Sequence, residues 1–270
     1  MENRNYIFII FLFIILAYYV NIVIADNAGS DTSNEFTIED TTLEANAWVT
    51  YAATDLGTFK TGVKGIISLN DVNIPDPPLF PTGLYTGIWT HIAIAKDEYS
   101  VDAGYMVEVG IRKLKYSTVI WTPIGFVPVI EEERGVFITY YDVNEDLKKT
   151  IIIEGQAELG KYYYVKITKI GSNVWVIGIW CPYNDKMYSY ILKSKDTYTT
   201  YYAFSQLEYY HYAGDSHIPE EPGETLNTNY DLEWEASNGY HDYNGMAVVH
   251  NFDNVEAIWT SDFYLSRISD

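Results

Sequence analysis

The sequence has almost no cysteine. Cys181 is its single cysteine, so a disulfide framework within one chain is excluded. Its setting, "VWVIGIWCPYND", is apolar and strand-like, which predicts a buried, inert thiol and not a nucleophile. The histidines lack the i, i+4 spacing of a helical zinc site; four of the five lie near the end of the chain, at His211, His217, His241 and His250. We therefore expect no metal site and no cofactor.

Basic residues are also scarce. The chain has 17 Lys and Arg against 37 Asp and Glu, for a formal net charge of −20. A nucleic acid partner is excluded because its phosphates would be repelled, and electrostatic docking to an anionic membrane is disfavoured for the same reason. The acids are spread along the chain, which favours a role in solubility over a calcium site, although calcium binding by the acidic loops stays open.

Long hydrophobic runs occur only at the N-terminus. Arg4 precedes the apolar run "IFIIFLFIILAYYVNIVIA", residues 7–25, which ends in a small-residue pattern typical of signal cleavage. The run is long for a signal peptide and just long enough to span a bilayer, so residues 1–25 are either a signal peptide or a membrane anchor. Both alternatives predict an exported protein, either secreted or attached to the cell surface through residues 7–25.

Helical periodicity is missing after this segment. Residues 26–43 are polar and read as a linker, and residues 44–270 read as one domain. Short β-rich runs such as "GVKGIISL", "GIWTHIAIA", "NVWVIGIW" and "KMYSYILK" alternate with turn signals rich in Pro, Gly, Asn and Asp. The spacing predicts an all-β sandwich or barrel, with a long polar loop from Ala213 to Asp231. No fixed-period repeat is present, which disfavours a propeller or solenoid.

One predicted strand, "EYSVDAGYMVEVG" (residues 98–110), carries an unexpected acid. Val101, Ala103, Tyr105, Val107 and Val109 share one face, and Asp102 lies on the other with Gly104, Met106 and Glu108. An acid on a strand usually faces solvent. The alternative is a functional carboxyl, which needs a partner elsewhere in the chain.

The order of the segments resembles the glutamic peptidases (eqolisins), a family of secreted acid proteases. The segments that carry the resemblance span roughly residues 58–265: "FKTGVKGIISLNDVNIPD", "TGIWTHIAIA", "VDAGYMVEV", "RGVFITYYDV", the hairpins within "IIIEGQAELGKYYYVKITKIGSNVWVIGIWCPYNDKMYSYIL", and "AFSQLEYY". The resemblance implies a concanavalin-A-like antiparallel β-sandwich (a jelly roll), preceded here by the N-terminal signal or anchor helix.

Carried over residue by residue, the resemblance places Glu208 on the catalytic glutamate and Trp89 on a tryptophan of the substrate cleft. Tyr140 and Tyr209, in "RGVFITYYDV" and "AFSQLEYY", are further substrate-binding residues on this expectation. Asp102 falls on the catalytic glutamine, and it is expected to face Glu208 across the concave face of the sandwich. An ionised aspartate cannot donate a hydrogen bond to an oxyanion, whereas a protonated one can, so any activity of an Asp102/Glu208 pair is confined to acid pH.

Two further functions remain open. A non-catalytic module on the same fold would bind a surface glycan or protein ligand in place of a polypeptide substrate. A glycosidase is less favoured because the closely spaced acids of an "ExDxE" strand are absent, although the sequence offers four sugar-stacking rings, those of Trp89, Trp121, Trp175 and Trp180. "DLEWEAS" alternates acids around Trp234, but it has no partner pattern.

Overall fold

The structure is a computed structural model of the 270-residue chain. It describes residues 35–36, 47–53, 60–95, 106–142, 147–154, 157–194, 202–211, 225–242, 247–250, 255–260 and 263–268. All of them belong to one unit, Glu35–Asp270. The predicted N-terminal signal or anchor, most of the predicted linker, and Asp102 lie outside the described residues.

The described residues form β-strands and no helix. Their bounds are β1 Glu35–Phe36, β2 Ala47–Ala53, β3 Gly62–Leu69, β4 Tyr85–Ala95, β5 Met106–Thr122, β6 Gly125–Asp142, β7 Leu147–Glu154, β8 Tyr163–Lys169, β9 Val174–Cys181, β10 Lys186–Lys193, β11 Tyr202–His211, β12 Thr225–Ala236, β13 Gly239–Asp242, β14 Ala247–His250, β15 Val255–Thr260 and β16 Phe263–Ile268.

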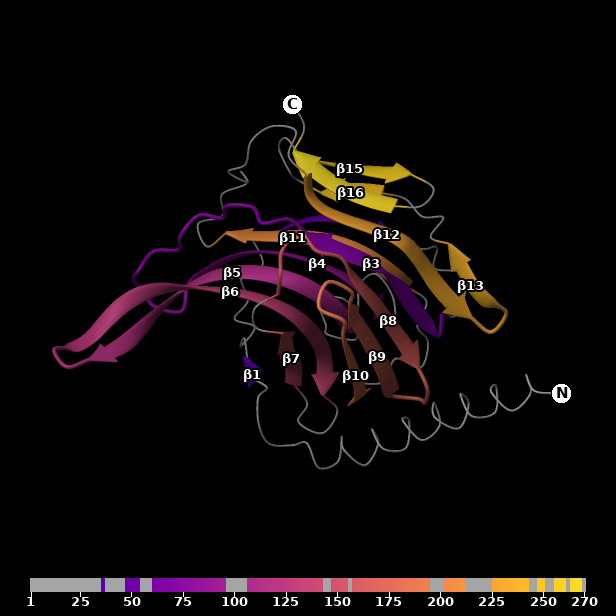
Figure 1. The fold of residues 1–270 in the computed structure, drawn as a ribbon, viewed down its shortest axis with the longest axis horizontal. Coiled ribbons are helices and arrows are strands. Elements are labelled where there is room, and N and C mark those ends of the chain that lie inside the picture. Colours follow the sequence, from indigo (N-terminus) through magenta and orange to yellow (C-terminus); the bar gives the residue numbers. More distant parts are fainter. Residues whose placement is uncertain are drawn as a thin grey trace. The chain divides into compact units, whose positions relative to one another are not determined.

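The strands form two antiparallel sheets (Figure 1). The first sheet has the order β1-β7-β6-β5-β4-β11-β2-β14. The second has the order β10-β9-β8-β3-β12-β16-β15, with β13 added on β12. The prediction of an all-β antiparallel fold is confirmed.

The main hydrophobic core lies between the two sheets. β4 and β5 of the first sheet contribute Ile92 and Val109, and β3 and β9 of the second contribute Ile67 and Ile177; all four side chains are buried. Strands β8 and β9 alternate buried and accessible residues, as expected of strands with one face on a core. Cys181 is buried in this core, as predicted.

Several strand bounds differ from those expected. Strands β3 and β10 match the predicted runs, but β5 is described only from Met106 and continues to Thr122, well beyond the predicted end at Gly110. The predicted loop from Ala213 to Asp231 is wrong in its last part, because β12 begins at Thr225 and pairs with both β3 and β16. Of the described residues, none forms a helix long and apolar enough to span a membrane.

Candidate functional site

Strands β11, β4 and β5 lie side by side in the first sheet and place Glu208 beside Trp89. Glu208 is in register with Trp89, and Trp89 with Arg112. Residues in register across antiparallel strands project to the same side, so these three side chains share a face. We call it the outer face, because the opposite face of the sheet packs into the main core. Two strand spacings put the Cα atoms of Glu208 and Arg112 about 10 Å apart.

Gln206 provides an amide next to the carboxyl of Glu208. The two residues are separated by one position on β11, so both side chains lie on the outer face. The Gln206 amide nitrogen donates a hydrogen bond to Glu208 Oε1. Gln206 is buried, whereas Glu208 and Trp89 are half-buried. A carboxylate with its amide donor therefore lies beside an indole on the outer face, and the carboxylate and the indole are partly exposed.

Arg112 is held by Glu133 of β6. The Arg112 Nε donates to Glu133 Oε1 at 2.8 Å, and its NH2 group lies 2.7 Å from the same oxygen. Both side chains are largely removed from water, which strengthens their mutual attraction and makes an unpaired partner costly. The guanidinium also lies over the Phe137 ring, 5.8 Å from its centroid.

A second buried acid–base pair lies further along the outer face. The Nε2 atom of His91 is 3.5 Å from Glu108 Oε2, and the His91 ring meets the Phe204 ring edge-on. Gly110 leaves the space for this arrangement. A Cβ atom at Gly110 would lie 2.7 Å from the Cβ of His91 and 2.8 Å from a Phe137 ring carbon, so a larger residue would displace them.

A polar network behind the site fixes β4 against β11. On the core face, Thr90 Oγ1 donates to the Gln206 carbonyl at 3.0 Å and accepts from the Asn229 amide at 2.7 Å. The same amide donates to Ser205 Oγ at 2.8 Å. Because Asn229 belongs to β12, this network also links the two sheets directly behind Gln206 and His91.

The aromatic end of the outer face holds neutral phenols. Tyr85 stacks on Tyr210 with ring centroids 4.4 Å apart, and Tyr116, in register with Tyr85, donates to Glu131 Oε2 at 2.9 Å. Partial burial and then the hydrogen bond to Glu131 raise the pKa of Tyr116 to about 12. Burial also raises the pKa of Tyr210. These groups therefore act as uncharged donors or stacking surfaces.

The predicted site residues are brought together only in part. Glu208 and Trp89 are neighbours, as a shared cleft requires. Tyr140 and Tyr209 lie on the core face, in register with Val107 and Ile88, and are buried in the main core. This corrects their expected position, because a ligand on the side of Glu208 would not contact them.

Asp102 stays a prediction, because it lies outside the described residues. In the described ladder the residue opposite Trp89 on β5 is Arg112. Sequence reasoning missed both Arg112 and Gln206. The "SQLE" stretch did contain a signal for Gln206, since a spacing of two on a strand puts both side chains on one face.

The strand arrangement is similar to that of solved glutamic peptidases. The chain matches SCP-B, a member of the eqolisin family solved with a tripeptide, at 11% identity and a TM-score of 0.48 over 84% of this chain and 100% of that one. It matches scytalido-glutamic peptidase with a peptide-based transition-state analogue at 10% identity and a TM-score of 0.49, with the same coverage.

A more distant likeness is to a glycoside hydrolase family 16 endo-glucanase from Bacteroides ovatus. The identity is 10% and the TM-score 0.30, over 72% of this chain and 81% of that one. No family model and no curated protein matches the sequence. At these identities and TM-scores, the activity of the chain has to be argued from its own residues.

Metal ligation has no support in the described part of the chain. Groups of three or more His, Cys, Asp and Glu able to hold an ion are absent there. What the outer face offers chemically is a carboxylate that can accept a proton, an amide that can donate a hydrogen bond, and an aromatic surface beside both.

Proposed function

We propose that the chain is an exported acid peptidase of the glutamic type on a concanavalin-A-like sandwich, and that Glu208 is its general base. The observation that carries the proposal is the contact between Glu208 and the Gln206 amide, beside Trp89. The segment resemblance places Glu208 on a catalytic glutamate independently of this contact. The substrate is a polypeptide lying along the outer face.

In the reaction, the Glu208 carboxylate takes a proton from a water molecule whose oxygen bonds to the scissile carbonyl carbon. The carbonyl oxygen becomes an oxyanion and needs a hydrogen-bond donor. When Glu208 becomes protonated it is a weaker acceptor, so the Gln206 amide is released and donates to the oxyanion. Glu208 then gives its proton to the leaving amine as the C–N bond breaks.

Asp102 is the alternative donor, as the resemblance implies. A protonated Asp102 would supply the hydrogen bond only at acid pH, whereas the Gln206 amide supplies it at every pH. The two proposals therefore differ in the expected pH profile of Asp102→Asn.

The test is a peptide-library digestion by the full-length chain from about pH 2 to about pH 7, a range that covers the titration of single and paired carboxyls. Glu208→Gln should lower the cleavage rate at least about a hundredfold, as expected for loss of a general base. Glu233→Gln, on the second sheet and paired with Lys64, is the matched control and should cleave normally.

Two further variants identify the oxyanion donor. If the donor is Gln206, Gln206→Ala loses about a hundredfold in kcat and Asp102→Asn leaves the pH profile unchanged. If the donor is Asp102, Asp102→Asn extends activity toward neutral pH. Cleavage that survives in Glu208→Gln would refute the peptidase proposal.

A non-catalytic binding module is the second candidate. It is favoured by the outer face itself, where the charge of Arg112 is already balanced by Glu133. Such a module would bind a glycan or protein ligand beside Trp89. Absence of cleavage by the wild-type chain at every pH, together with ligand binding that Trp89→Ala abolishes, would support it.

Export is proposed from residues 7–25 alone. Intact-mass measurement of the chain after expression in a secreting host separates the two forms. Loss of residues 1–25 indicates a signal peptide, and retention in the membrane fraction indicates an anchor.

A further inference from the structure

The hairpin of β5 and β6 extends beyond the first sheet. Pairing of β4 with β5 ends at Tyr116, and pairing of β7 with β6 begins only at Val136. Residues 117–130, which we call the arm, pair with each other through the turn at residues 123–124. Figure 1 shows the arm projecting away from the other described strands. Over residues 118–130, no described strand pairs with either edge.

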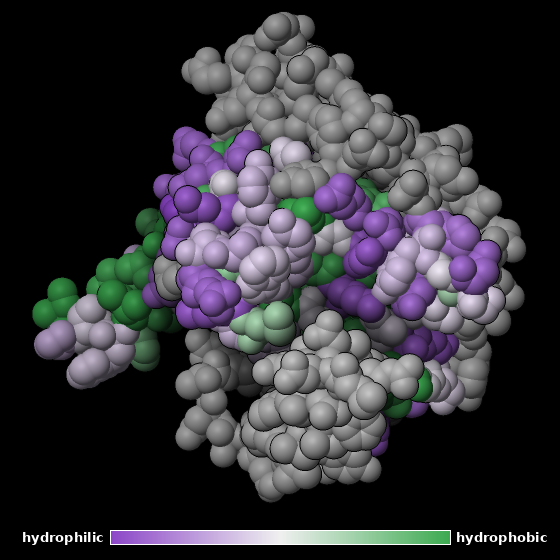
Figure 2. All heavy atoms as spheres, turned by 45° about the vertical axis from the view of Figure 1, so that its right-hand side comes forward, coloured by the Kyte–Doolittle hydropathy of each residue, from purple (hydrophilic) through white to green (hydrophobic). Residues whose placement is uncertain are grey.

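The arm is uncharged and its apolar side chains are exposed. Its sequence, "STVIWTPIGFVPVI", has no Asp, Glu, Lys or Arg, within a chain of net charge −20. Trp121, Ile124 and Phe126 are 72%, 92% and 74% exposed. Figure 2 shows a projection of green and pale residues at the left of the described surface. The adjoining loop adds exposed Phe80 and is hydrogen-bonded to the arm, with Gly83 N donating to Ser117 O at 2.8 Å.

Both faces of the arm are apolar. Trp121 is in register with Phe126 and projects to one face. Ile120 is in register with Val127 and projects to the other. A protein partner that docks on one face of a ribbon leaves the other face in water. A hydrocarbon medium surrounds both faces, so the pattern favours a lipid surface over a protein groove.

The turn at the tip satisfies part of its own backbone. Thr122 Oγ1 donates to the Gly125 carbonyl at 2.7 Å and accepts from Ile124 N at 3.3 Å. The free edges further back carry backbone groups that need water, because unpaired groups cost several kcal/mol each in hydrocarbon. The arm is about 24 Å long, and only its tip, residues 121–126, suits entry into a layer whose half-thickness is about 15 Å.

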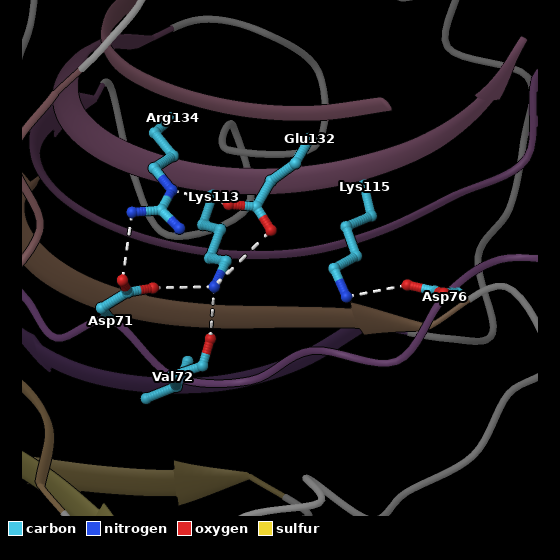
Figure 3. A network of polar contacts seen from close by, with 7 residues as sticks. All are labelled: Asp71, Val72, Asp76, Lys113, Lys115, Glu132 and Arg134. Carbon is cyan, nitrogen blue, oxygen red and sulfur yellow. Dashed lines mark hydrogen bonds and ion pairs between the residues drawn. The ribbon is translucent and has the colours of Figure 1, made fainter. Parts of the chain in front are cut away.

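Charged residues begin where the arm joins the sheet (Figure 3). Lys113 Nζ lies 2.8 Å from Asp71 Oδ1, and Lys115 Nζ lies 2.7 Å from Asp76 Oδ1. Arg134 Nε donates to Glu132 at 2.6 Å. The pairs of Lys113 and Lys115 attach the loop after β3 to the base of the arm, so that the base carries charges and the arm does not. The arm itself, residues 117–130, has no charged side chain and is therefore suited to an apolar medium.

We propose that the tip of the arm inserts into the interface of an electrically neutral phospholipid bilayer. Trp121 and Phe126 lie at the headgroup level and Ile124 reaches the acyl chains, an arrangement that suits aromatic side chains. Neutral lipid is preferred because the net charge of −20 is repelled by an anionic surface. This interaction does not depend on the proposed hydrolytic activity.

The test uses the full-length chain with an environment-sensitive fluorophore on an introduced cysteine. Cys181 is 0% exposed, so the label goes to the new site. Ile124→Cys carries the probe at the tip, and Met187→Cys, 75% exposed on β10, is the control away from the arm. Because residues 7–25 are present in both, attachment through them affects both equally.

With phosphatidylcholine vesicles, the probe at position 124 should shift to the blue and brighten about twofold or more, since it leaves water. The probe at position 187 should not change. No change at position 124, or equal changes at both positions, would overturn the proposal. A blue shift at position 124 without vesicles that grows with protein concentration would also overturn it, because it would identify self-association.

A second measurement uses vesicle flotation. The triple variant Trp121→Ser, Ile124→Asn, Phe126→Ser should lower the arm-dependent partition about tenfold or more, since it removes most of the apolar tip. Ile170→Asn with Met187→Ser, both exposed elsewhere, should float like the wild-type chain. Circular dichroism checks that both variants are folded. Equal flotation of the two variants, together with an unchanged probe at position 124, would contradict the insertion.

Discussion

The two faces of the first sheet are buried to a similar extent but differ in chemistry. On the core face behind the candidate site, Ile92 and Val109 pack among aliphatic side chains, and the hydrogen-bonded polar groups beside them are uncharged ones of Thr, Ser and Asn. On the outer face, Arg112 and Glu108 are nearly as buried; Arg112 is ion-paired with Glu133, and Glu108 lies 3.5 Å from His91. Around the candidate site, buried charged side chains therefore lie on the outer face, whereas on the core face a buried charge, that of Lys113, appears further along β5.

The largest expected effect on stability comes from a substitution on the core face. Ile92→Ala should lower the free energy of unfolding by about 2–5 kcal/mol, because it removes buried methyl groups and leaves a cavity. Ile92→Val, as the conservative control, should cost about 1 kcal/mol. Denaturant unfolding measures both. A loss below about 1 kcal/mol for Ile92→Ala would mean that the core face is not tightly packed around Ile92.

The outer face should respond differently to single and paired changes. Arg112→Met leaves the carboxylate of Glu133 without its partner and should cost about 3 kcal/mol. The double variant Arg112→Met, Glu133→Leu removes both charges and should lie within about 1 kcal/mol of the wild-type chain. Denaturant unfolding of both single variants and the double variant gives the coupling free energy between Arg112 and Glu133. Additive losses would show that the pair is not coupled.

The smallest expected effect on stability is at Asp71, which pairs with Lys113 and Arg134 at the polar end of the core face. Partial burial raises the pKa of Asp71, but the hydrogen bonds and charges of Lys113 and Arg134 outweigh it and lower the pKa below 3.8. A lowered carboxyl pKa stabilises the fold above the unfolded-state value, and this contribution is lost as the pH falls through the folded-state pKa.

Asp71→Asn should therefore lower stability near neutral pH by up to about 1 kcal/mol, as for a partly exposed ion pair. The difference from the wild-type chain should shrink as the pH falls below 3.8 and vanish once Asp71 is protonated. Thermal unfolding as a function of pH tests this. A difference that stays constant down to low pH would rule out an electrostatic origin.

The all-β class and the bounds of β3 and β10 could be predicted because turn residues mark their ends and apolar residues fill them. The long arm could not, because its strands are defined by pairing with each other and "TPIG" is a weak turn signal. The start of β12 was missed because "TLNTNYDLE" is polar, and its Asn side chains are buried through partners on other strands. Such long-range partners are not visible in a local pattern.

The site could be predicted at Glu208 and Trp89, which came from the resemblance and lie in register. The side of the sheet to which Tyr140 and Tyr209 point was not predicted. In a sheet buried on both faces an alternating pattern does not say which face is which, and a shift of one residue exchanges them. Arg112 was missed because its significance depends on the register of β4 with β5.

The pairing order of the strands has a consequence for synthesis. Strand β4 pairs with β11, and β3 pairs with β12, so each sheet contains a central strand from the first third of the chain beside one from its last third. The bond between Thr90 and Gln206 alone closes a separation of 116 residues. Neither sheet can be completed while the chain is emerging, because closing such long loops precedes the contacts that stabilise them. The early strands therefore keep open edges until β11 and β12 have been made.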